Sequence, residues 1–113
     1  MANFLESNLT LLQAYDPALA KRLFHYSPTG RAEVFLTPQR RLSLRIHQAP
    51  APCLLHSGQD PEREAERWAA GVTISSPYNL LVMGCGLLHH VRALVKNHLD
   101  TLRNLIIVEK DWE

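Results

Sequence analysis

The residues best suited to chemistry are two glycines, Gly84 and Gly86, which follow the apolar run 80–83 and precede a helical pattern. In a strand-to-helix turn of this kind, backbone N–H groups can approach a phosphate or an adenosine-containing ligand, because no Cβ holds the backbone away. The apolar run 105–108 ends at Glu109, 25 residues after Gly84. An acidic group about 20 residues after such a turn typically accepts ribose hydroxyls. The spacing predicts a nucleotide site.

The glycine turn departs from a full dinucleotide fingerprint. Leu88 and His89 stand near the place of its third glycine, so a close-packed pyrophosphate turn is not indicated. His90, at the first helical turn, is a candidate for contact with a ligand phosphate, although a solvated imidazole is the more common fate. A purely structural interpretation, in which the glycines only turn the chain and Glu109 is a solvated strand end, stays open.

A second polar cluster lies at His56, Ser57 and Asp60. Three residues this close in sequence rarely converge as a hydrolytic triad, and Asp60 before Pro61 is better suited to cap a helix. We predict that Ser57 and Asp60 shape the surface beside the glycine turn. An alternative of equal weight is that Asp60 only caps the helix and that Glu64 and Arg67 form a surface ion pair.

Composition excludes several classes of function. Six histidines and two cysteines occur without the spacing of a zinc or iron site, so we expect no metal. A net charge of +1 does not indicate the basic surface that nucleic-acid binding requires. The first residues lack the basic start of a signal peptide, and no apolar run reaches membrane-spanning length. We expect a cytoplasmic protein without a membrane span.

Residues 1–52 are expected to form an N-terminal module. Asn3 and Asp16 precede two short helical patterns, the second from Pro17 to about Phe24. Runs at 33–36 and 42–47 predict a β-hairpin, and in the second run the apolar residues Leu42, Leu44 and Ile46 alternate with the polar residues Ser43, Arg45 and His47. This alternation predicts one face exposed to water.

Residues 53–113 are expected to form the second unit. The run 53–55 predicts a short strand, and Asp60-Pro61 opens a helix that stops at Gly71. Beyond it, a strand, a helix and a second strand form a βαβ unit. The predicted fold class is an α+β N-terminal module, with helices and a β-hairpin, followed by a partial α/β Rossmann-like βαβ unit.

The stretch 55–68 resembles a motif of the bacterial motility accessory factors, proteins of flagellin glycosylation. The matching residues include His56, Ser57, Asp60, Pro61, Glu64, Ala65 and Arg67, followed in order by Gly84, Gly86, Leu87, His90 and Glu109. The resemblance implies a Rossmann-like domain similar to the archaeal 6-hydroxymethylpterin diphosphokinase. Leu88, His89 and Lys110 depart from the residues usual in the family, which places the ligand-facing turn in question.

The resemblance also implies that the chain is the N-terminal part of a longer protein, since family members extend several hundred residues further. The parent would resemble a glycosyltransferase that binds a nucleotide-activated sugar and acts on flagellin, while these 113 residues would be inactive alone and hold no cofactor. An unfinished parallel sheet predicts self-association through its exposed edges. Two alternatives remain: part of an S-adenosylmethionine-dependent methyltransferase, against which Val82 occupies the place of an expected acid, and a pure interaction module.

Overall fold

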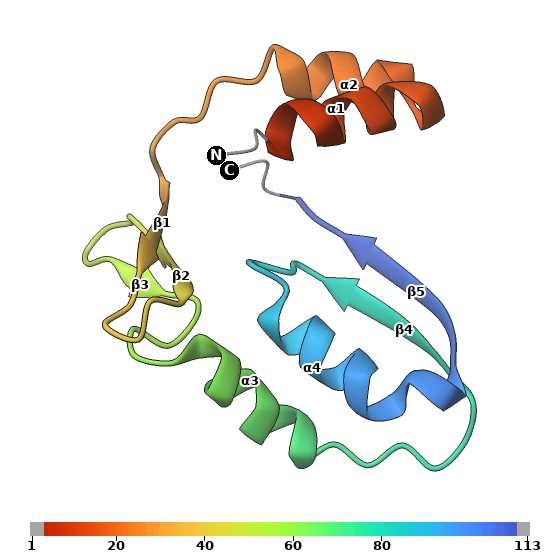
Figure 1. Cartoon of the computed structure of the whole chain (residues 1–113). Helices are drawn as coiled ribbons and strands as arrows, with labels where there is room; N and C mark the ends of the chain where they lie inside the picture. The colour runs from red at the N-terminus through yellow and green to blue at the C-terminus, as the bar shows by residue number, and fades with distance from the viewer. Residues whose placement is uncertain (1–3, 111–113) are drawn as a thin grey trace.

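A computed structural model describes residues 4–110 and shows a mixed α+β chain with an antiparallel sheet and a separate parallel pair of strands (Figure 1). The mixed architecture expected from the sequence is confirmed. The elements follow in the order α1 (Phe4–Tyr15), α2 (Pro17–Phe24), β1 (Ala32–Leu36), β2 (Leu42–Ile46), β3 (Cys53–Leu54), α3 (Pro61–Ala70), β4 (Tyr78–Met83), α4 (His89–His98), a short 3-10 helix η1 (Leu99–Thr101) and β5 (Leu102–Val108).

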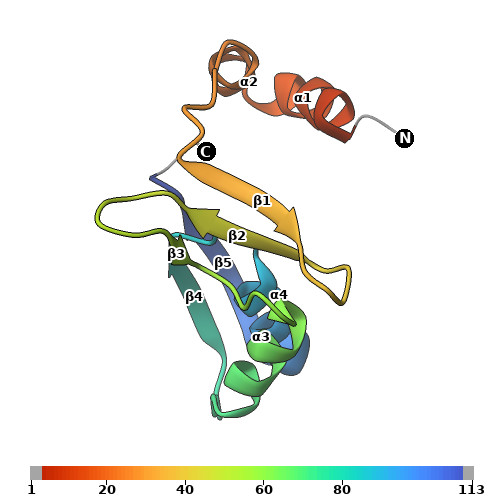
Figure 2. The same ribbon diagram turned by 90° about the vertical axis from the view of Figure 1, so that its left-hand side faces the viewer.

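The helices α1 and α2 form a hairpin that is set apart from the remaining elements in both views (Figures 1 and 2). Asp16 caps α2, since its Oδ1 accepts the N–H of Leu19 at 2.9 Å and Pro17 follows as the first helical residue. The start predicted at Asp16 is therefore confirmed. The predicted cap at Asn3 lies outside the described residues.

The strands β1, β2 and β3 form an antiparallel sheet with β2 in the centre. The expected hairpin is confirmed, but the wet face predicted for the second strand is wrong at Ser43, which is fully buried, whereas Leu42 is 52% exposed. The hydroxyl of Ser43 donates to the backbone carbonyl of His56 at 3.0 Å. The segment after β3 covers this face, so the polar side chain is buried with a partner.

The helices α3 and α4 pack against each other through small side chains. Asp60 begins α3 as predicted, because its Oδ1 accepts the N–H of Arg63 at 3.0 Å. Ala65 and Ala69 of α3 are buried against Ala93 of α4. Methyl-sized side chains allow the two helix backbones to approach closely, and Figure 1 shows α4 lying between α3 and the strands β4 and β5.

The strands β4 and β5 run parallel, with Leu80 opposite Leu105 and Met83 opposite Val108. This confirms the predicted strand–helix–strand order. The helix α4 begins at His89, because Leu88 takes a left-handed backbone conformation with φ of 66°. A leucine in this conformation carries a steric cost that glycine would avoid.

Much apolar surface remains open in this fold. On one face of the parallel pair, the register neighbours Leu81 and Ile106 are 59% and 55% exposed. The accessible surface of 8797 Å² exceeds the roughly 6300 Å² usual for a folded monomer of this mass. The radius of gyration, 16.1 Å, likewise exceeds the roughly 13 Å of a compact domain of this length. The elements are thus ordered around a small core.

Within residues 4–110, none of the helices combines the length and the apolar character required to cross a membrane.

Candidate functional site

A cleft of about 940 Å³ lies between the antiparallel sheet and the βαβ unit. We call it the central cleft. Its apolar walls include Val34, Leu44 and Ile46 from the first sheet and Leu80, Val82, Val91 and Leu94 from the βαβ unit. Its polar lining includes Arg31, His56, Cys85, His90 and Glu109, and both Gly84 and Gly86 line it. Four of the six predicted ligand residues are therefore brought together.

The glycine turn requires residues that tolerate left-handed backbone angles. Gly84 has φ of 76° and Gly86 has φ of 51°. The two positions differ in their surroundings: a Cβ on Gly84 would meet nothing within 4 Å, whereas a Cβ on Gly86 would lie 2.6 Å from Nε2 of His56. Gly84 thus faces open space, and Gly86 provides room for an imidazole.

The carboxylate of Glu109 lies directly on this turn. Its Oε2 accepts the backbone N–H of Cys85 at 2.9 Å and a weaker bond from the Cys85 thiol at 3.4 Å. Burial, followed by the hydrogen bond to Glu109 and its negative charge, raises the pKa of the Cys85 thiol. The end of β5 therefore places a negative charge at the start of the turn.

His56 holds the other side of the turn, a role that the sequence did not suggest. The residue is 6% exposed, and Nε2 accepts the backbone N–H of Leu87 at 2.9 Å. The ring stacks on His90, with centroids 5.7 Å apart, and meets the edge of His89 at 5.0 Å. Burial, and then the charges of His89 and His90, lower the pKa of His56.

The hydrogen bond to Leu87 determines the state of the His56 ring. Since Nε2 accepts, the neutral imidazole carries its proton on Nδ1. Among residues 4–110, this buried Nδ1 has no hydrogen-bond partner. A buried polar atom without a partner costs free energy, so the contact with the turn is retained in spite of that cost.

Ser57 and Asp60 have local roles in the structure. The Oγ of Ser57 accepts the N–H groups of Gln59 and Asp60, and the N–H of Ser57 donates to Glu64 Oε2 at 2.8 Å. Neither Ser57 nor Asp60 lines the central cleft. They shape the approach of α3 to the turn, while a ligand role for the two residues stays a prediction.

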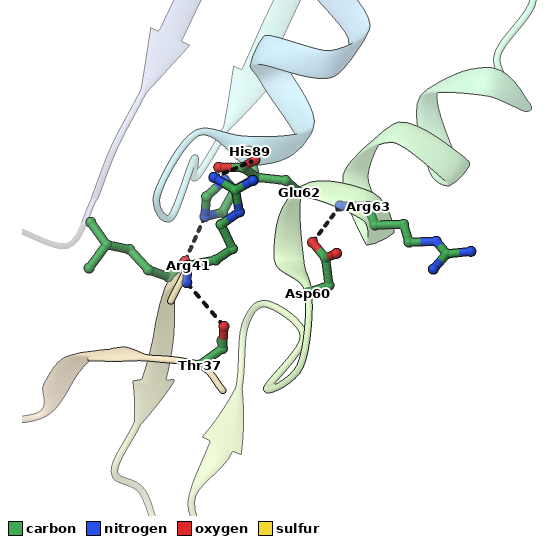
Figure 3. A network of polar contacts seen from close by, with 7 residues as sticks. Thr37, Arg41, Asp60, Glu62, Arg63 and His89 are labelled. Carbon is green, nitrogen blue, oxygen red and sulfur yellow. Dashed lines mark hydrogen bonds and ion pairs between the residues drawn. The ribbon is translucent and has the colours of Figure 1, made fainter. Parts of the chain in front are cut away.

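A polar network connects the β1–β2 turn with both central helices (Figure 3). Nε2 of His89 bonds the carbonyl of Leu42 at 2.8 Å, and Nη1 of Arg41 lies 3.5 Å from Oε2 of Glu62. The N–H of Arg41 donates to Oγ1 of Thr37 at 3.2 Å, which closes the strand turn. The start of α4 is thereby held from the side of the first sheet.

Within the described part of the chain, no three histidine, cysteine or carboxylate side chains gather in a way that could hold a metal ion. Comparison of the chain with family models, with curated proteins and with solved structures finds no match.

Proposed function

We propose that the central cleft binds the nucleoside part of a nucleotide-activated sugar, and that the chain serves a glycosyltransferase-like motility accessory protein. The observation that carries the proposal is the position of Glu109. Its carboxylate lies at the carboxyl end of a parallel strand, beside a glycine turn that ends the neighbouring strand. Ligands of Rossmann-like and other open α/β sheets bind at this edge.

The geometry suits a ribose. A carboxylate offers about four acceptor positions, so Glu109 can accept ligand hydroxyls in addition to the Cys85 N–H. Open space before Gly84 gives room for the sugar ring. The apolar walls of the cleft supply a surface for a base, in the usual proportion of many apolar groups to a few polar ones.

A hydrogen bond between the two segments that carry the family resemblance supports the same proposal. His56 comes from the motif that precedes α3, and Leu87 comes from the glycine turn, 31 residues later. A direct hydrogen bond between them gives the motif a physical task, which is to hold the ligand-facing turn. The residues that carry the resemblance thus form one structural unit.

A methyltransferase that uses S-adenosylmethionine is the second candidate function. The observation that favours it is that the Glu109 carboxylate already accepts the Cys85 N–H, where a phosphate would otherwise bind. S-adenosylmethionine has ribose hydroxyls that can bind this carboxylate, and it has no phosphate. Binding of S-adenosylhomocysteine at least about tenfold tighter than adenosine would favour this candidate, because a tenfold difference corresponds to about 1.4 kcal/mol of specific contact.

The test is a titration of the chain with cytidine, uridine and adenosine, in which binding is monitored through the NMR chemical shifts of the backbone amides. We expect shifts centred on Gly84, Cys85 and Gly86. Glu109→Gln should weaken the tightest nucleoside about tenfold or more, because a charge-assisted hydrogen bond becomes a neutral one. Glu66→Gln, which removes an exposed carboxylate of α3, is the matched control and should bind like the wild type. Absence of binding, or equal binding by Glu109→Gln, would refute the proposal.

A further inference from the structure

We infer that the Glu109 carboxylate excludes phosphate from the Cys85 N–H at the start of the glycine turn, and that it selects a ligand whose group at this place is uncharged or cationic. The inference rests on the proposed nucleoside site and specifies its ligand. It reverses the expectation from the sequence that the N–H groups of the turn face a phosphate. A nucleotide-activated donor should therefore bind less tightly than its free nucleoside.

Four backbone donors of the turn already have acceptors. Gly84 donates to the carbonyl of Val108 at 2.8 Å, and Leu88 donates to the carbonyl of Cys85 at 2.9 Å. Two further N–H groups go to side chains: Cys85 to Glu109 and Leu87 to His56, each at 2.9 Å. A phosphate bound at a helix start depends on such donors. At any of these four donors a phosphate would have to displace a partner.

Charge acts against a phosphate as well. An anion that took the Cys85 N–H would replace the Glu109 carboxylate or lie beside it. Two like charges a few ångströms apart repel each other at the effective dielectric of a protein surface. The same carboxylate already contributes to raising the pKa of the Cys85 thiol, which shows the direction of its effect on a negative charge at this place.

Hydroxyl donors and cations, unlike phosphate, are attracted to the Glu109 carboxylate. A hydroxyl can donate to Glu109 without loss of the Cys85 bond, and a positive centre is attracted by the carboxylate. The space beside Gly84 is unobstructed, since an added Cβ would meet no atom within 4 Å. Steric access is therefore present at the turn, and charge decides which ligand group enters.

The experiment compares each nucleoside with its own diphosphate. Adenosine with ADP, and cytidine with CDP, are titrated into the wild type, Glu109→Gln and the control Glu66→Gln. We expect each nucleoside to bind the wild type about tenfold more tightly than its diphosphate, and the Glu109→Gln change to remove or reverse that order. The control should keep the wild-type order. Tighter binding of the diphosphates by the wild type would overturn the inference and leave the nucleoside site standing, whereas no binding by any compound would refute both.

A second measurement tests the charge without any ligand. In a Cys53→Ser background, Cys85 is the one remaining cysteine of the sequence. The rate of its alkylation by iodoacetamide as a function of pH gives its apparent pKa, because the thiolate is the reacting form. Glu109→Gln should lower this pKa, and Glu66→Gln should leave it unchanged. An unchanged pKa in Glu109→Gln would show that the carboxylate does not act on the turn and would overturn the inference.

Discussion

The imidazole of His56 accepts the backbone N–H of Leu87, and this hydrogen bond fastens the segment before α3 to the turn before α4. The bond has a steric counterpart at Gly86, where only the absence of a side chain leaves room for the ring. His56 and Gly86 therefore fit each other, while Gly84 keeps the same type of backbone angle without a neighbour. The pair of glycines provides an internal comparison.

Gly86→Ala should lower the free energy of unfolding more than Gly84→Ala. Both changes place alanine in a left-handed conformation, at a cost of about 1–2 kcal/mol. Only the first also forces the new Cβ against a buried ring, which adds about 1–3 kcal/mol of overpacking. Urea denaturation measures both. In a His56→Ala background the difference between the two substitutions should vanish, and a difference that persists would mean that the ring is not the obstacle.

Stability should decrease in acid through His56. Because its pKa is lowered in the folded state, the unfolded chain binds the proton more readily. Neutral His56 thus stabilises the folded form above the ordinary pKa of about 6.5, and this contribution is lost as pH falls from there through the lower folded value. Protonation of Nε2 also removes the acceptor for Leu87.

The measurement is thermal unfolding from about pH 7.5 to about pH 5, across the ordinary histidine pKa. His56→Gln keeps a side-chain acceptor but does not titrate, so its melting temperature should fall less steeply than that of the wild type. The histidines outside this cluster, His25, His47 and His98, are common to both proteins and cancel in the comparison. Parallel pH profiles would show that His56 does not supply the dependence.

The two aspartate caps should have different effects. Asp60→Ala removes the cap of α3, which packs on α4, and should lower global stability by about 0.5–2 kcal/mol. Asp16→Ala removes the matching cap of α2 in the helical hairpin, so it should lower helix content more than the global transition. Circular dichroism and denaturation separate the two effects. Nucleoside affinity should be retained in both, and its loss in Asp60→Ala would place the site at the motif before α3.

Self-association is expected from the open parallel sheet. Apolar side chains of β4 and β5 are exposed on the sheet face. Within residues 4–110, no further strand pairs with the outer edges of this two-stranded sheet. Light scattering at high micromolar concentration should show a dimer or a larger species. Leu81→Lys with Ile106→Lys should reduce it, whereas Leu11→Lys on α1 should not. A wild-type monomer would contradict the prediction.

Local signals predicted most of the elements. Proline after aspartate marked the starts of α2 and α3, and the change from apolar runs to helical spacing marked β4, α4 and β5. The burial of Ser43 could not be predicted, because it depends on the later segment that carries His56. The same holds for His56 at the turn: its partner is 31 residues away, and no period in the sequence links the two.

The alanine contact between α3 and α4 makes Trp68 an optical reporter of the turn. Ala65, Ala69 and Ala93 leave little freedom for the helices to slide, so a displacement of the start of α4 also moves α3. Trp68 lies on α3, is about half exposed and has its ring 5.3 Å from that of His90. Its fluorescence should therefore change when a ligand occupies the glycine turn, once the second tryptophan, Trp112, is replaced by phenylalanine.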